Sequence, residues 1–187
     1  QAFRVVPREE FVWPSTRHSA YADSPLPLGD TGQTISAPHM VAIMLEELDL
    51  HPGLDVLEVG AGSGYNAALM AEILRSGSAG EKGHVTTVER IPMLVEFARK
   101  NLERTGYLDI VTVVEGDGTL GYPERSERET YDRIVVTAAA PHLPRYLKAQ
   151  LKVGGILLTP AGDLWIQDLV KAVKLEGVKF IEKRLCS

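Results

Sequence analysis

Short apolar runs alternate with helical patterns between residues 51 and 163, and this alternation leaves few folds open to the chain. The runs are nearly continuous, which is typical of parallel strands that are buried on both faces. Strands are expected at residues 56–59, 85–88, 111–114, 134–137 and 156–159. Helices are expected at residues 39–48, 67–74, 92–105 and 141–151. The pattern therefore predicts an α/β fold with a doubly wound, mostly parallel sheet.

The two ends of the chain depart from this rhythm. Five prolines within residues 1–38 predict an irregular segment with short helices, because proline fixes φ and lacks a backbone donor. Residues 169–173 and 178–181 lie on either side of Glu176-Gly177. They predict an antiparallel hairpin on the edge of the sheet.

The length of 187 residues suits one domain with a buried core. We expect residues 1–50 to form a cap outside the sheet, and residues 51–187 to form a Rossmann-like core. The chain opens without a methionine and closes directly after a strand-like stretch. We therefore expect both termini to be trimmed.

Composition limits the compartment and the partners. The net charge of −5 and the pI near 5.6 argue against a protein that mainly holds phosphate backbones, so no nucleic-acid partner is expected. The single cysteine, Cys186, cannot form an internal disulfide, and the histidines are too scattered for a metal site. We expect no leader, and no apolar run approaches the roughly 20 residues that span a bilayer. We expect a cytoplasmic protein with no membrane partner.

A glycine-rich turn follows the first expected strand directly. Gly60, Gly62 and Gly64 alternate with other residues, among them Ser63, and a helical pattern comes next. Glycines at such a turn let the backbone approach a ligand closely. The spacing is not the G-x-G-x-x-G of dinucleotide enzymes, in which a pyrophosphate lies on the helix N-terminus. The turn predicts a nucleoside site at the carboxyl ends of the strands.

Two acids are expected at the same edge of the sheet. Glu89 ends the second strand, where a carboxylate can accept hydrogen bonds from both ribose hydroxyls. Asp117 follows the third strand between Gly116 and Gly118, where it can accept from an adenine amino group, although this tripeptide also suits a plain turn. Together with the glycine turn, the acids describe a pocket for a nucleoside without a pyrophosphate. S-adenosyl-L-methionine fits that description.

Several blocks of the sequence resemble the protein-L-isoaspartate O-methyltransferase family. The block Gln33 to Met40, QTISAPHM, is the most specific of them. The others, in family order, are residues 5–12, 21–23, 25–28, 56–65, 116–118, 131–132 with 134–141, and 151–160. The match spans nearly the whole chain, whereas a glycine turn by itself is common to many methyltransferases.

The resemblance implies a class I S-adenosylmethionine-dependent methyltransferase fold, in which residues 1–50 would form a cap over the substrate and cofactor. It also implies a protein repair reaction. The enzyme would methylate the α-carboxyl of L-isoaspartyl residues in damaged proteins and peptides and release S-adenosyl-L-homocysteine. The ester would then return through a succinimide to aspartate. The resemblance assigns Ser36 to the active site, and a monomer is favoured. The expected cofactor contacts are Gln33, Thr34, Ile35, Ser36, Glu58, Gly60, Gly62, Ser63, Gly64, Glu89, Arg90, Asp117 and Gly118.

Chemistry is consistent with a serine at this position. A carboxyl group with a pKa near 4 is ionised at neutral pH, so it needs no general base. Transfer of a methyl group from a sulfonium neutralises both charges, so alignment and exclusion of water should dominate catalysis. A serine hydroxyl can orient one carboxylate oxygen without removing its charge.

Other interpretations remain open at single residues and for the whole chain. Ser36 could instead cap the helix that begins near His39. His39 could be a site residue or a solvated first-turn residue, and we expect the latter. Asp23 could line the cleft or form a turn with Ser24-Pro25. The chain could methylate another acceptor such as RNA or a metabolite, act as a nucleotide-dependent oxidoreductase, or bind the cofactor without catalysis.

Overall fold

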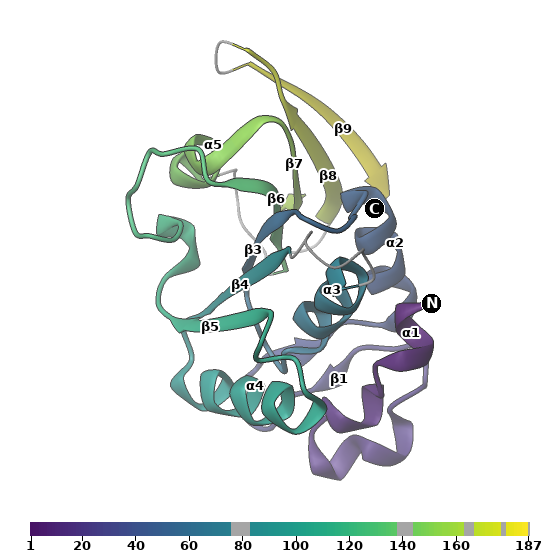
Figure 1. Ribbon diagram of the computed structural model, residues 1–187. Coiled ribbons are helices and arrows are strands. Elements are labelled where there is room, and N and C mark those ends of the chain that lie inside the picture. Colours follow the sequence, from purple (N-terminus) through teal and green to yellow (C-terminus); the bar gives the residue numbers. More distant parts are fainter. Residues whose placement is uncertain (76–82, 138–143, 163–166, 177–178, 187) are drawn as a thin grey trace.

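A seven-stranded sheet forms the centre of the computed structural model, which describes residues 1–75, 83–137, 144–162, 167–176 and 179–186 (Figure 1). The strand order is β5-β4-β3-β6-β7-β8-β9. The pairs from β5 to β7 are parallel, and the last two pairs are antiparallel. The strands are β3 (Asp55–Val59), β4 (His84–Glu89), β5 (Val111–Glu115), β6 (Tyr131–Val136), β7 (Leu151–Gly162), β8 (Gln167–Lys174) and β9 (Phe180–Cys186).

Helices cover both faces of the sheet, as the continuous apolar strands predict. The helices are α2 (Pro38–Leu48), α3 (Tyr65–Arg75), α4 (Pro92–Thr105) and α5 (Arg145–Gln150). Val56 packs in a cluster with residues of α2, α3 and α4, whereas its neighbour Leu57 packs in a second cluster with Leu147 of α5. Successive side chains of a strand point to opposite faces, so β3 contributes to both layers of the core. The predicted α/β fold with a mostly parallel sheet is confirmed.

The order of the strands fixes where a ligand can bind. The chain enters the sheet at β3, moves outward through β4 and β5, and then returns to place β6 on the other side of β3. In such sheets, the ligand site lies beyond the carboxyl ends of the strands, at the point where the order reverses. Here that point is the edge at which β3, β4 and β6 end.

The N-terminal segment contains short elements, as its prolines predict. These are α1 (Ala2–Val5), η1 (Arg8–Glu10), η2 (Pro14–Ser19), and the two-residue strands β1 (Leu26–Pro27) and β2 (Thr34–Ile35). Helix α1 contacts α3, and Figure 1 shows this purple segment beside α3 and α4. The antiparallel pair formed by β1 and β2 was not predicted. Trp13 packs against Phe97 of α4, with 4.9 Å between the ring centroids, so it joins the segment to the core.

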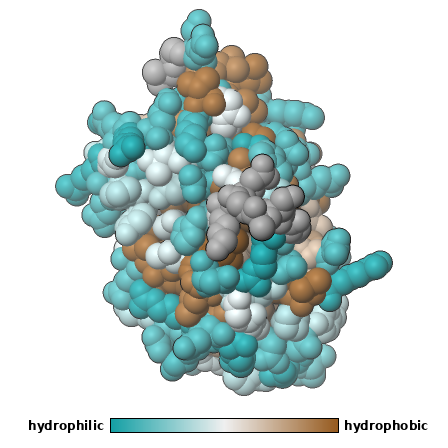
Figure 2. Space-filling view, viewed as in Figure 1, coloured by the Kyte–Doolittle hydropathy of each residue, from teal (hydrophilic) through white to brown (hydrophobic). Residues whose placement is uncertain are grey.

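Two predicted elements near the C-terminus are a helix before β7 and an antiparallel hairpin at the edge of the sheet. The helix expected at residues 141–151 is wrong at its end, because Leu151 already pairs with Tyr131 as the first residue of β7. Its first three residues lie outside the described part of the chain. The edge hairpin is confirmed as β8 and β9, although residues 177–178 are not described. No helix within the described ranges is long and apolar enough to cross a bilayer. Figure 2 shows a largely hydrophilic face with separate hydrophobic groups.

Candidate active site

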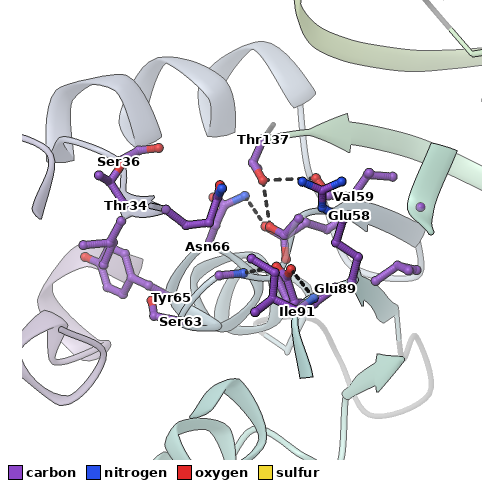
Figure 3. A pocket seen from close by; sticks show the side chains of 18 of the residues that line it. Thr34, Ser36, Glu58, Val59, Ser63, Tyr65, Asn66, Glu89, Ile91 and Thr137 are labelled. Atoms are coloured by element: carbon purple, nitrogen blue, oxygen red, sulfur yellow. Dashed lines mark hydrogen bonds between the residues drawn. The ribbon is translucent and has the colours of Figure 1, made fainter. Parts of the chain in front are cut away.

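A pocket of about 490 Å³ opens where the strands of the parallel sheet end (Figure 3). Its walls come from the turns after β3, β4, β5 and β6, together with β2 and helix α2. The lining residues are Gly32–Ser36, Val41, Met44, Glu58–Ser63, Tyr65, Asn66, Val88–Ile91, Gly116–Thr119 and Thr137. Twelve of the thirteen residues that the sequence nominated therefore meet at one cavity, although they come from four separate stretches of the chain.

The glycine turn takes a backbone conformation that other residues rarely adopt. Gly60, Gly62 and Gly64 have φ angles of 99°, 53° and 84°, so each lies in the region where a Cβ causes strain. Gly64 is the one nominated residue that does not line the pocket. A Cβ there would lie 3.2 Å from Leu102 of α4, so this glycine serves the packing of α3 against α4.

Glu89 is buried at the end of β4 and holds two turns of the backbone. Its Oε2 accepts a hydrogen bond of 3.0 Å from the amide of Gly62, and its Oε1 accepts one of 3.0 Å from the amide of Ile91. Each carboxylate oxygen can accept more than one hydrogen bond. Glu89 can therefore hold the turns and still accept from a ligand in the pocket that it lines.

Glu58 lies deeper in the pocket and is fully buried. Asn66 Nδ2 donates to its Oε1 at 2.8 Å, and Thr87 Oγ1 donates to its Oε2 at 2.6 Å. Burial raises the pKa of Glu58 to about 7, and the nearby charge of Glu89 adds to this increase. Asn66 Oδ1 is buried and has no hydrogen-bond partner in the described part of the chain. The pocket therefore contains an acceptor that an N–H group of a ligand would satisfy.

Asp117 and Gly118 form the turn after β5. Asp117 Oδ1 accepts from the amide of Thr119 at 3.0 Å and from its hydroxyl at 2.7 Å, so the carboxylate caps the short helix η3 (Gly118–Leu120). The side chain is exposed and lines the pocket as well. Gly118 leaves no room for a side chain, because a Cβ would lie 2.5 Å from Val59 Cγ1. The turn suggested by the sequence and the pocket-lining position are thus both present.

Ser36 lies at the opposite side of the pocket from Glu89, next to Thr34 and Tyr65 (Figure 3). The helix-capping interpretation of Ser36 is wrong, because Ala37 is the N-cap of α2 and no side chain caps it from that position. Instead, Asp23 Oδ1 accepts from the His39 amide at 3.0 Å and contacts the His39 ring at 2.9 Å. His39 is a solvated first-turn residue as expected. Asp23 is not among the residues that line the pocket.

Three polar residues that line the pocket were not predicted from the sequence. Thr137 Oγ1 donates to the carbonyls of Val59 and Gly60, at 3.0 and 2.7 Å, and so joins the ends of β3 and β6. Asn66 and Tyr65 project from the first turn of α3 and line the pocket. Their position directly after the glycine turn is the feature of the sequence that could have indicated them. Among the described residues, no group of three or more His, Cys, Asp or Glu side chains could hold a metal ion.

The arrangement suits a nucleoside ligand that carries a cationic amine. The turns offer close backbone approach, and three acids of the pocket wall can accept from hydroxyl and amino groups. S-adenosyl-L-methionine has hydroxyl groups on its ribose, an amino group on its adenine and an ammonium group, so the acceptors that line the pocket fit the donors of this ligand. The buried Asn66 oxygen without a partner among the described residues is the observation that fits a donor group of the ligand.

Comparisons with known proteins agree with this geometry. A Staphylothermus marinus protein-L-isoaspartate O-methyltransferase is 57% identical over 98% of this chain and 80% of its own length, and one from Hyperthermus butylicus is 58% identical over 98% and 75%. A solved structure from Plasmodium falciparum, assigned to the same enzymes, was crystallised with S-adenosyl-L-homocysteine. It matches this chain with a TM-score of 0.85 at 29% sequence identity, and the match covers 100% of this chain and 85% of the Plasmodium chain. The model of the protein-L-isoaspartate(D-aspartate) O-methyltransferase family matches residues 1–187. The chain therefore belongs to the protein-L-isoaspartate(D-aspartate) O-methyltransferase family.

Proposed function

We propose that this pocket transfers a methyl group from S-adenosyl-L-methionine to the α-carboxyl of L-isoaspartyl residues in damaged proteins. The proposal rests on one observation: residues suited to bind the cofactor and residues suited to bind the acceptor line the same cavity. The glycine turn, Glu89 and Asp117 line the cavity and form the nucleoside side that we propose. Thr34 and Ser36 of the stretch Gly32–Ser36 lie on another side, and Figure 3 shows Asn66 between them and Glu89. Methylation of this carboxyl is the step that allows return to aspartate through a succinimide.

The nucleoside side would hold the cofactor through backbone and carboxylate groups. Glu89 is the candidate acceptor for the ribose hydroxyls, and Asp117 is the candidate acceptor for the adenine amino group. Glu58 and Asn66, both deep in the pocket, present oxygens toward a cationic amine. When bound, S-adenosyl-L-methionine supplies an electrophilic methyl group on a sulfonium. The remaining nominated contacts are Gln33, Thr34, Ile35, Ser36, Gly60, Gly62, Ser63, Arg90 and Gly118.

Ser36 would orient the acceptor rather than act as a nucleophile or base. An ionised carboxylate needs no base to activate it, so the reaction does not require Ser36 to accept or donate a proton. The serine hydroxyl can donate to one carboxylate oxygen and leave the other free to attack. Alignment of the attacking oxygen and removal of water then account for the chain's contribution to the rate.

The decisive experiment compares two synthetic peptides that differ only in Asp versus L-isoAsp. Each is incubated with the protein and methyl-labelled S-adenosyl-L-methionine, and base-labile methyl ester is counted. We expect ester on the isoaspartyl peptide alone. Transfer to neither peptide, with retained binding of S-adenosyl-L-homocysteine, would reject isoaspartyl repair and turn attention to another acceptor.

We also propose that the chain acts in the cytoplasm as a monomer, on proteins rather than nucleic acids. The net charge of −5 supports the exclusion of nucleic acid, and the single cysteine supports a reducing compartment. Sedimentation velocity tests the assembly state. A binding titration with RNA at low salt tests the partner class, with no saturable binding expected.

A further inference from the structure

Arg8 is a buried cation that no acidic side chain of the described residues contacts. Its side chain belongs to η1 and is 1% exposed. Nε donates to the carbonyl of Ala20 at 2.7 Å, and Nη2 donates to the carbonyl of Ser36 at 2.8 Å. Nη1 is buried and has no hydrogen-bond partner in that same part of the chain. A buried charge is costly unless an opposite charge compensates it, so this arrangement is unusual for a purely structural tie.

No carboxylate among the described residues compensates Arg8 by contact. Tyr65 contacts the guanidinium through its ring and as a side-chain partner, but it is a neutral side chain. Asp23 interacts with the guanidinium only through space, and its carboxylate is exposed and already accepts from His39. Lys174, another buried cation, has a carboxylate at 2.9 Å on Glu129. Arg8 therefore keeps a positive charge that the surrounding protein neutralises only weakly.

The position of this charge relates it to the acceptor side of the pocket. Arg8 contacts two residues that line the cavity, because its guanidinium bonds to the backbone of Ser36 and lies 4.9 Å from the ring centroid of Tyr65. Figure 3 shows Ser36 and Tyr65 on the side away from Glu89. Arg8 thus lies directly behind the wall on which the acceptor is expected to bind.

We propose that Arg8 is a positioning residue that favours an ionised carboxylate beside Ser36 without touching it. This inference rests on the proposed function, in which the acceptor is the α-carboxylate of an isoaspartyl residue. A direct ion pair would hold the attacking oxygens and reduce their nucleophilicity, whereas a charge behind the wall attracts the anion and leaves its oxygens available. When the ester forms, the carboxylate charge disappears. The attraction to Arg8 then disappears too, which favours product release.

The test measures discrimination between a charged and a neutral ligand at the same subsite. One probe is an L-isoaspartyl peptide, and the other is the same peptide with a carboxamide in place of the free α-carboxyl. Their dissociation constants are measured by calorimetry in the presence of S-adenosyl-L-homocysteine. We expect the wild-type protein to bind the carboxylate peptide at least about tenfold more tightly than the carboxamide peptide. An attraction of this size is reasonable for a carboxylate that one layer of protein separates from the Arg8 charge.

Variants separate the charge of Arg8 from its structural role. Arg8→Met should remove the preference for the carboxylate peptide, whereas Arg8→Lys, which keeps the charge, should retain most of it. Arg17→Met is the matched control, because Arg17 lies on the same N-terminal segment, is exposed, and pairs with Glu10. The preference of this variant for the carboxylate peptide should equal that of the wild type. If Arg8 had only a structural role, Arg8→Met would weaken the binding of both peptides equally, and the ratio of the two dissociation constants would not change.

Three outcomes would overturn the proposal. The first is that Arg8→Met keeps the wild-type preference for the carboxylate peptide. The second is that Arg8→Lys folds but loses this preference, and the third is that the wild-type protein binds both peptides equally. If Arg8→Met does not fold, the lysine variant alone still decides. Failure of the proposed function itself gives a different result, because the wild-type protein would then bind neither peptide.

Discussion

Glu89 Oε2 accepts a hydrogen bond of 3.0 Å from the backbone amide of Gly62. The bond joins the end of β4 to the glycine turn after β3, so two walls of the pocket are fixed relative to each other by the protein itself. Hydrogen bonds to a charged group are stronger than neutral ones and are lost together when the carboxylate is removed. Glu89 is therefore expected to affect both the fold and the ligand.

Glu89→Ala should lower the free energy of unfolding by about 3 kcal/mol, because two backbone donors lose a buried acceptor. It should also weaken binding of S-adenosyl-L-homocysteine at least about tenfold. Urea unfolding and calorimetry give the two quantities. Glu96→Ala is the control, since this exposed acid pairs with Lys100 on the surface of α4, and its effect should stay within about 0.5 kcal/mol. Unchanged ligand affinity in Glu89→Ala would remove Glu89 from the binding site.

Gly118→Ala should destabilise the protein by about 1–3 kcal/mol and weaken binding of S-adenosyl-L-homocysteine. The added methyl group would meet the stiff side chain of Val59 at 2.5 Å, which forces the turn away from β3. Gly116→Ala is the matched control in the same turn, because its nearest neighbour, Glu124 Oε1, would lie 3.6 Å from the new Cβ. Equal losses in the two variants would show that the close approach to Val59 does not matter.

The buried carboxyl of Glu58 should make stability depend on pH. Its pKa is about 7 in the folded protein, against an ordinary value of 4.5 for glutamate. Between these values, the folded state holds a proton that the unfolded state has released. Stability should therefore fall by about 3 kcal/mol as the pH rises from 4.5 to 7, and this contribution should not change above that range.

Glu58→Gln isolates this contribution, since glutamine is the same size and does not titrate. The difference in unfolding free energy between the two proteins, measured in urea from about pH 4.5 to about pH 8, should increase in favour of the variant as the pH rises. Other titrating groups cancel in the difference. A difference that is independent of pH would mean that Glu58 does not change protonation in this range.

The parallel sheet was predictable because each buried strand is a short apolar run and most of the strands are separated by a helical pattern. The order of the strands was not predicted, and β5 and β6 are joined through the short helix η3 rather than through an α-helix. The end of α5 was not predicted correctly, because Leu147 and Leu151 are both fully buried and four residues apart. That spacing is helical, yet Leu151 already pairs with β6. The pair of β1 and β2 has only two residues in each strand, which is too short for any alternation to be detected.

The site was predictable where residues adjoin the ends of strands, and less so where tertiary contacts decide. Arg8 contacts the carbonyl of Ser36 across 28 residues of sequence, and no local pattern indicates such a contact. The same holds for Asp23, which caps α2 from 16 residues upstream and so leaves Ser36 without that role. Loop-to-loop hydrogen bonds of this kind depend on the folded backbone, and only the structure identifies them.

Asp117 caps η3, and different substitutions should separate this cap from the adenine contact that we propose for the same side chain. Asp117→Asn keeps an oxygen that can accept from Thr119, so the cap of η3 and the stability should remain close to those of the wild type. Asp117→Ala should lose about 1 kcal/mol with the cap. Both variants should bind S-adenosyl-L-homocysteine more weakly, and both should lose discrimination against its inosine analogue, which lacks the amino group. Retained discrimination in Asp117→Asn would assign the adenine contact elsewhere.

Ser36→Ala should lower methyl transfer while the fold and the binding of S-adenosyl-L-homocysteine change little. The hydroxyl does not cap α2, and the bond from Arg8 goes to the backbone carbonyl, which alanine retains. Loss of a group that only aligns the acceptor should reduce kcat/KM at least about tenfold. Ser15→Ala, an exposed serine of the same segment, is the matched control and should retain full activity. If Ser36→Ala matches it, the hydroxyl does not orient the acceptor, and the backbone of the stretch Gly32–Ser36 becomes the candidate for that role.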